Sequence, residues 1–225
     1  MTYEEFIALY RATDSVPQIP ALDGLDRIDW GAMKHAYGSA ADIPALFRAL
    51  LSGDPVHRDL ALEGLVQTIR HEGNIFPATL HVIPILYNLL EADGPHDKAK
   101  VACLLAMIAD GEPSFTFCEG DPAAADEWRA ILKNVGRSLD IEVAEGRSLM
   151  TEIRELLSAC LDLLCPYLRD PEPAVRQSVA VAFGRFPEIG RRCLPDLKAA
   201  LADETDDYAR DALQGVVEHL TTASL

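Results

Sequence analysis

The sequence predicts an all-α protein made of repeated helix pairs, and three observations support this fold class. Hydrophobic residues make up 49% of the 225-residue chain but aromatic residues only 7%. The core must therefore consist mainly of Leu, Ala, Val and Ile, which suits closely packed helices. Apolar residues recur at helical spacing in several segments. The same order of proline, acidic turn and basic residue also returns along the chain, which is typical of helical repeats.

We expect these helices to form a single domain over residues 1–225, because a repeat array of this length can bury one continuous core. Residues 1–42 are predicted to form an N-terminal helical cap, and residues 43–110 the first two repeats. An insert at 111–146 then precedes a long helix and two further repeats at 147–225.

The first two repeats emerge from a comparison of two proline-containing segments. IPALFRALL, which begins at Ile43, returns as IPILYNLLE about 40 residues later, a spacing typical of helix-pair repeats. The comparison aligns Pro44 with Pro84 and Arg58 with Lys98. We expect each proline near the start of a first helix, where the missing N–H costs little.

The last two repeats share a proline, an acidic turn and an arginine. CPYLRDPEPAVRQSVAVAF resembles LPDLKAALADETDDYARDAL, so that Arg176 aligns with Arg210. In the first of these segments, Asp170 and Pro171 are expected to end one helix. The helix that follows has an apolar face at helical spacing, made of Val175, Val179, Ala182 and Phe183.

The proline start, the Asp-containing turn and the arginine of the second helix resemble HEAT repeats. The resemblance implies a right-handed α-solenoid, or α-α superhelix, of HEAT-like pairs. In that family the aspartate and arginine are commonly structural and bond between neighbouring turns. The resemblance therefore implies scaffold roles for the matching residues Pro44, Arg58, Pro84, Asp170, Arg176 and Arg210.

A narrower resemblance concerns the first half of the chain. DWGAMKHAYGSAADIPALFRALLSGD at residues 29–54, followed by HEGNIFPAT at residues 71–79, looks like the N-terminal part of a group of largely uncharacterised bacterial HEAT-domain proteins. This resemblance implies a bacterial origin and brings no catalytic residue with it.

The insert is predicted to be ordered. Its helix DPAAADEWRAILKNVG has Asp121 as N-cap and Gly136 as its C-terminal stop. A second, long helix is expected from Arg147 to Cys165. Before these helices lie Phe115 and Phe117, which can either pack beneath the insert or be presented to a partner.

The N-terminal sequence and the lack of a long apolar run indicate a cytoplasmic protein. The N-terminal residues MTYEEFIALYRATDSV lack the basic region of a secretory signal, and no apolar run reaches the ~20 residues of a membrane span. None of the five cysteines belongs to a C-x-x-C pair. We expect all of them to be reduced core residues: Cys103, Cys118, Cys160, Cys165 and Cys193.

No catalytic motif is present in the sequence. His71 and Glu72 begin like the zinc motif H-E-x-x-H, but position 75 is isoleucine, so no metal site is expected. There is no G-x-S-x-G, phosphate loop or dinucleotide fingerprint, and no cofactor is predicted. Two enzyme classes with HEAT-like folds stay as less favoured alternatives. DNA glycosylases need a basic channel, and proteins resembling bilin lyases would need a cysteine pattern that the chain lacks.

Charge indicates the class of partner. The chain has 36 acidic residues against 20 Lys and Arg, a formal net charge of −16, which repels nucleic acid and anionic lipid and attracts basic proteins. We therefore expect a non-catalytic protein-binding scaffold whose partner has a basic surface. Small acidic bacterial helical-repeat proteins resemble the immunity proteins that neutralise secreted toxins; the alternative is a regulatory adaptor of an endogenous enzyme. The predicted binding residues are Asp59, Glu63, Phe115, Phe117, Asp211, Gln214 and Glu218.

Overall fold

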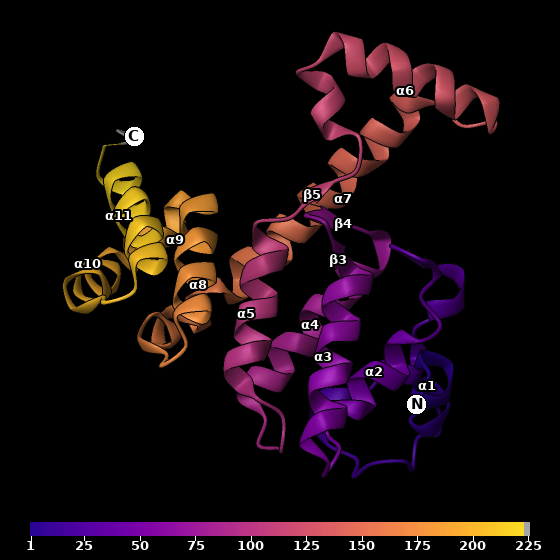
Figure 1. The fold of residues 1–225 in the computed structure, drawn as a ribbon, viewed down its shortest axis with the longest axis horizontal. Helices are drawn as coiled ribbons and strands as arrows, with labels where there is room; N and C mark the ends of the chain where they lie inside the picture. The colour runs from indigo at the N-terminus through magenta and orange to yellow at the C-terminus, as the bar shows by residue number, and fades with distance from the viewer. Residues whose placement is uncertain (223–225) are drawn as a thin grey trace.

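The computed structural model describes residues 1–222, and this part of the chain is mostly helical, as predicted (Figure 1). The α-helices are α1 (Tyr3–Leu9), α2 (Ile43–Ala49), α3 (Pro55–Ile69), α4 (Pro77–Glu91), α5 (Lys98–Ala109), α6 (Pro122–Asn134), α7 (Leu139–Cys160), α8 (Pro173–Arg185), α9 (Pro187–Arg192), α10 (Leu194–Asp203) and α11 (Asp207–Thr222). Short 3-10 helices are η1 (Pro20–Leu22), η2 (Leu25–Arg27), η3 (Trp30–Ala32), η4 (Thr116–Glu119) and η5 (Leu161–Arg169). The strands are β1 (Lys34–His35), β2 (Gly38–Ser39), β3 (Arg70–His71), β4 (Asn74–Ile75) and β5 (Glu112–Pro113).

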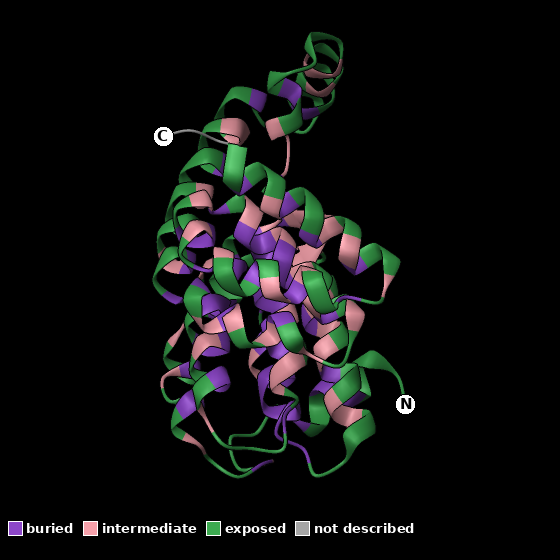
Figure 2. Cartoon of the chain, turned by 90° about the vertical axis from the view of Figure 1, so that its left-hand side faces the viewer, coloured by how far each residue is buried: buried purple, intermediate pink, exposed green. Residues whose placement is uncertain are grey.

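The helices pack in consecutive pairs. α2 contacts α3, α4 contacts α5, η5 contacts α8, and α10 contacts α11. The second members of these pairs also contact one another in succession, α3 with α5, α5 with α8 and α8 with α11, so they follow one another across the molecule (Figure 1). Buried residues, purple in Figure 2, are concentrated in the middle of the packed helices.

Local signals explain the helix between Pro173 and Arg185. Pro173 stands in the first turn of α8, where a missing N–H costs little. The predicted apolar face is buried, as Val175, Val179, Ala182 and Phe183 show. Gly184 lets α11 approach closely, because a Cβ at this position would lie 3.0 Å from Cγ2 of Val216.

The N-terminal 42 residues are less helical than predicted. Only α1 is an α-helix, and the remainder forms the turns η1 to η3 and the antiparallel hairpin β1–β2, with Lys34 opposite Ser39. Pro20 interrupts any longer helix, and Gly24 and Gly38 have φ angles of 90° and 120°, in the left-handed region that favours glycine.

A small sheet joins the first two helix pairs to the insert. β3 and β4 form a hairpin whose turn residues Glu72 and Gly73 have φ angles of 50° and 86°. β5 adds to β4 in parallel, with Ile75 opposite Pro113. These strands were not predicted, because two residues are too few to show an alternating pattern.

The insert forms an arm, which we define as η4, α6 and the N-terminal half of α7. As predicted, α6 begins at the N-cap Asp121, whose carboxylate accepts from two backbone amides at 3.0 and 3.1 Å, and Gly136 follows it with a φ of 72°. The long helix begins at Leu139 rather than Arg147 and gives way to η5 after Cys160, so its predicted ends were wrong. The arm projects from the other helices and is largely exposed (Figures 1 and 2).

The expectation that all cysteines are reduced was wrong for one pair. Cys165 in η5 and Cys193, between α9 and α10, form a disulfide, with Cα atoms 6.6 Å apart. Cys103, Cys118 and Cys160 are free. The two bonded cysteines lie far apart in sequence and become neighbours only because the chain turns back through α8 and α9, so no spacing motif announces the pair.

Candidate functional site

A groove of about 730 Å³ lies between α1, the β1–β2 hairpin and α3, and we call it the α1 groove. Its lining is mostly apolar and includes large side chains that are exposed to solvent. Tyr37 is 64% exposed, Val56 62%, Tyr3 49% and Leu60 41%. Large apolar side chains gathered around a concavity are typical of a surface that binds another molecule.

Helix α1 is positioned by its capping box. The Thr2 hydroxyl accepts from the backbone amide of Glu5 at 3.2 Å, and the Glu5 carboxylate accepts from the amide of Thr2 at 2.7 Å. Phe6, one turn further on, is buried in the core and holds the helix against the body. Tyr3 and Phe6 are three residues apart and therefore lie on the same side of α1, facing the groove.

Helix α3 supplies the opposite wall. Val56, Leu60 and Glu63 are spaced i, i+4 and i+7, so they form one stripe along the helix. The β1–β2 hairpin is tied to the end of this helix, because the amide of Ala36 donates to the carbonyl of Thr68 at 2.9 Å. Both walls of the α1 groove are therefore fixed by backbone structure.

A polar network centred on Asp42 joins three segments at the groove. The Tyr3 hydroxyl donates to Oδ2 of Asp42 at 2.6 Å, and Nε2 of His35 lies 2.9 Å from Oδ1. The backbone amide of Tyr37 donates to Nδ1 of His35 at 3.0 Å. Because Nδ1 accepts a hydrogen bond, Nε2 carries the hydrogen and donates a hydrogen bond to Asp42.

Two pKa values reflect this network. Burial is the main cause that raises the pKa of the Tyr3 hydroxyl, and the hydrogen bond to Asp42 adds to it. Burial also acts to raise the pKa of the Asp42 carboxyl, but hydrogen bonds from His35 and Tyr3 outweigh it and hold that pKa below its usual value. Asp42 is therefore the ionised acceptor at the centre of the network.

The polar groups of the network are occupied by one another. His35 is 6% exposed and both of its ring nitrogens are hydrogen-bonded. Both oxygens of Asp42 are occupied as well. Across residues 1–222, no group of three or more His, Cys, Asp or Glu side chains is arranged to hold a metal ion.

The rim residue Tyr37 is held by contacts beyond the hairpin. Its ring meets the ring of His71 edge to face, with centroids 5.1 Å apart, and its hydroxyl lies 3.2 Å from Nδ1 of that histidine. The side chain of Gln67 on α3 lies 3.2 Å from the same nitrogen. Tyr37 is thus both exposed and held in place.

Of the predicted binding residues, the structure brings only Glu63 to the α1 groove. Asp59 lies on the same helix, but its carboxylate bonds to Nζ of Lys100 at 2.6 Å and joins α3 to α5. Three further candidates are exposed on α11, at the other end of the molecule from α1 (Figure 1): Asp211, Gln214 and Glu218. Gln214 donates to Glu218 at 2.9 Å.

The two phenylalanines of the insert have different surroundings. Phe115 packs edge to face on Trp128, with ring centroids 5.2 Å apart, and both border the small core of the arm around Cys118, Leu132 and Leu139. Phe117 is 53% exposed. Phe115 is therefore half-buried against the arm, whereas Phe117 is exposed to solvent.

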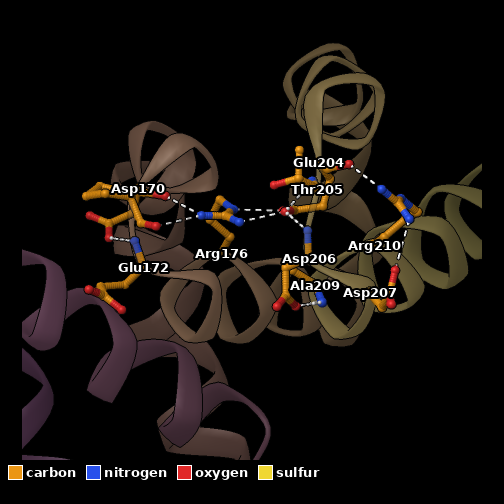
Figure 3. Close-up of polar contacts among 10 residues, drawn as sticks. Asp170, Glu172, Arg176, Glu204, Thr205, Asp206, Asp207, Ala209 and Arg210 are labelled. Atoms are coloured by element: carbon orange, nitrogen blue, oxygen red, sulfur yellow. Dashed lines mark hydrogen bonds and ion pairs between the residues drawn. The ribbon is translucent and has the colours of Figure 1, made fainter.

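The residues assigned to the scaffold form a recurring contact. Arg58 donates to the carbonyl of Ser52 at 2.8 Å, Arg176 to that of Asp170 at 2.7 Å, and Arg210 to that of Glu204 at 2.7 Å. In each case the arginine bonds the carbonyl six residues earlier, in the turn that follows the preceding helix. Figure 3 shows the last two of these contacts.

The second helix pair departs from this pattern. The prediction that Pro84 begins a helix was also wrong. Lys98, which aligns with Arg58, lies 4.0 Å from the carboxylate of Asp93. Pro44 stands in the first turn of α2, as expected, but Pro84 lies inside α4. The helix begins instead at Pro77, so the repeat comparison placed its start almost two turns too late.

Most residues of the α1 groove were not predicted. Tyr3, His35, Tyr37 and Asp42 come from a helix, a hairpin and the start of α2, and no local pattern connects them. To predict that these residues meet, one would have needed to know how the three segments pack. The helical spacing of Val56, Leu60 and Glu63 was visible in the sequence, but it did not show which side of α3 is covered.

Comparison of the chain with protein-family models, with curated proteins and with solved structures finds no match. Within the described residues, no helix is long and apolar enough to cross a membrane.

Proposed function

We propose that this chain is a non-catalytic protein-binding scaffold of HEAT-repeat type that holds its partner in the α1 groove. The observation that carries the proposal is the set of exposed apolar side chains on fixed walls, above all Tyr37, Val56 and Leu60. Aromatic and large apolar residues that are exposed together are enriched at the energetic centres of protein interfaces.

The helix pairs support the repeat part of the proposal. Four pairs follow one another, their second helices contact in succession, and an arginine bonds the carbonyl six residues earlier in three of them. We infer a right-handed solenoid that the arm interrupts between the second and third pairs. In such an array each pair contacts mainly its neighbours, which leaves long preformed surfaces for binding.

The rigidity of the groove supports binding without catalysis. Tyr3, Asp42 and His35 are already hydrogen-bonded to one another, so the walls need little ordering when a partner arrives. A preformed surface lowers the entropic cost of association. Such a surface suits stoichiometric binding.

The charge of the chain indicates the kind of partner. The net charge is −16, and Glu63 lies in the groove among apolar side chains. A partner with a basic surface that surrounds an apolar anchor complements both features. We propose that the partner is a basic bacterial toxin and that this chain is its immunity protein.

The test compares two double variants with matched chemistry. Tyr37→Ser with Val56→Ser removes two exposed apolar side chains from the α1 groove, whereas Tyr208→Ser with Val135→Ser removes the same residue types from α11 and the arm, where they are 76% and 66% exposed. A partner captured at low salt from the native cell is identified by mass spectrometry, purified and titrated with each variant by calorimetry.

The proposal expects the groove variant to weaken binding by about a hundredfold and the control variant to leave it within about twofold. Inhibition of a toxic activity of the purified partner at one-to-one stoichiometry would support the immunity role. Capture of an endogenous enzyme, with no toxic activity that the chain inhibits, would point to an adaptor instead. Equal binding by the groove variant and the wild type would contradict the assignment of the groove.

A further inference from the structure

A second groove, of about 610 Å³, lies between η2, α4 and α7, and we call it the α4–α7 groove. It shares no lining residue with the α1 groove. Leu25 and Ile85 are buried beneath it, and Ile28, Leu80 and Leu156 are half-buried at its surface. Its floor can therefore receive apolar side chains.

The charged side chains that line this groove are all carboxylates. Glu152 and Glu155 stand three residues apart on α7, so they lie next to each other on one helix face. Asp23 comes from the opposite wall, directly after η1. Among the described residues, no lysine or arginine forms an ion pair with any of the three. Their negative charges are therefore not neutralised by the protein itself.

Two other surface pockets each contain a carboxylate that is paired with a cation. In the pocket between α3 and α5, Asp59 is paired with Lys100 at 2.6 Å. In the pocket beside α10, Glu204 is paired with Arg176 at 2.5 Å. Asp59 and Glu204 therefore already have a cation, whereas the α4–α7 groove combines an apolar floor with carboxylates that lack one.

A proline interrupts the backbone hydrogen bonds of α4 beside the same groove. Pro84 lies inside α4 and has no N–H to donate to the carbonyl of Leu80, one turn earlier. Both residues line the groove. The turn of α4 that lines the groove therefore lacks one helical hydrogen bond.

We propose that the α4–α7 groove is a second docking site, which binds a basic amphipathic segment of a partner protein. Apolar side chains of that segment would lie on Leu25, Ile28 and Ile85, and its arginine or lysine side chains would reach Glu152 and Glu155. The long aliphatic stems of these cations suit a site where carboxylates surround an apolar floor. The inference deepens the proposed function, since it rests on the role of the chain as a protein-binding scaffold.

The test uses three labelled helical peptides of identical length and leucine pattern. The first has arginine at every polar position, the second has citrulline, which keeps the shape but removes the charge, and the third has glutamate. Fluorescence anisotropy at low and high salt measures their affinity for the full chain. We expect the arginine peptide to bind at least about tenfold more tightly than the citrulline peptide, and the glutamate peptide not to bind.

Two pairs of variants localise the binding. Glu152→Gln with Glu155→Gln should lower the affinity for the arginine peptide about tenfold. Glu127→Gln with Glu188→Gln removes the same charge from exposed positions elsewhere and should change that affinity less than twofold. Ala159→Trp fills the groove without a change of charge and should also block binding, whereas Ala130→Trp on the exposed side of α6 should not.

Equal weakening by both glutamate pairs would overturn the inference, because it would show attraction to the net charge alone. Unchanged binding by the Ala159→Trp variant would overturn it as well. The Tyr37→Ser, Val56→Ser variant separates this inference from the proposed function. If the arginine peptide binds this variant normally while no natural partner depends on the α1 groove, the second site stands and the proposed function fails.

Discussion

The guanidinium of Arg176 in α8 bonds both oxygens of the Glu204 carboxylate, at 2.7 Å from Nε and 2.5 Å from Nη2 (Figure 3). Glu204 directly follows α10 and its side chain is 1% exposed, against 13% for Arg176. The same carboxylate accepts from the backbone amides of Thr205 and Asp206, both at 2.9 Å. This bidentate pair therefore joins the third helix pair to the fourth at the turn before α11.

Removal of the Glu204 charge should destabilise the fold. We expect Glu204→Gln to lower the free energy of unfolding by about 2 to 3 kcal/mol, because the largely buried Arg176 then lacks its counter-charge. Urea unfolding followed by circular dichroism measures the change. The control is Asp162→Asn, which breaks a pair with Arg192 whose side chains are more than half exposed, and should cost less than about 1 kcal/mol. Equal losses would contradict the importance of the buried pair.

The same pair predicts a dependence of stability on pH. The hydrogen bonds from Arg176 are the main cause that lowers the pKa of Glu204, to about 2. A carboxyl whose pKa is lower in the folded state contributes stability above its unfolded pKa of about 4.5 and loses it as the pH falls towards 2. The difference in unfolding free energy between the wild type and Glu204→Gln should therefore shrink between about pH 4.5 and pH 2. A difference that stays constant over this range would contradict the low pKa.

Removal of one hydroxyl tests the network at the α1 groove. Tyr3→Phe deletes the hydrogen bond to Asp42, so we expect the pKa of Asp42 to rise towards its usual value. The loss in unfolding free energy should be about 1 kcal/mol. Carbon-13 NMR of the aspartate carboxyls follows the pKa directly. Tyr208→Phe on α11, where no hydrogen bond of this kind forms to Asp42, is the control and should leave that pKa unchanged.

The disulfide predicts a defined number of reactive thiols. Denatured protein that has not been reduced should react with three thiol equivalents, from Cys103, Cys118 and Cys160, and reduced protein with five. Replacement of both bonded cysteines by serine should lower the unfolding free energy by about 3 kcal/mol, as the loop between them is no longer closed. Disulfides are typical of oxidising compartments, whereas the N-terminal sequence led us to expect the cytoplasm. Five free thiols in protein quenched directly from the native cell would contradict the bond.

Two glycines offer opposite outcomes for the same substitution. A Cβ at Gly190 in α9 would lie 2.5 Å from the carbonyl oxygen of Phe183, so Gly190→Ala should destabilise the chain by about 1 to 3 kcal/mol. Among the described residues, nothing lies within 4 Å of a Cβ at Gly215 in α11, and Gly215→Ala should stabilise by up to about 1 kcal/mol through helix propensity alone. Thermal unfolding distinguishes the two, and a stabilising Gly190→Ala would contradict the close packing of α8 and α9.

The sequence by itself determined the features that depend on neighbouring residues. Asp121 and Gly136 bound α6, Pro173 begins α8, and the apolar face around Val179 is buried as its spacing predicts. These signals act through caps, φ angles and helical periodicity, all of which are local. The largely helical fold and one groove residue, Glu63, could therefore be predicted without knowledge of any long-range contact.

Tertiary structure alone decided the site. Asp42 meets Tyr3 across 39 residues of sequence, and Cys165 meets Cys193 across 28. The start of α4 at Pro77 rather than near Pro84 was decided in the same way, because a helix that buries its apolar face can tolerate an internal proline. Contacts of this kind depend on which helix faces pack together, and the spacing of residues within one segment does not determine that packing.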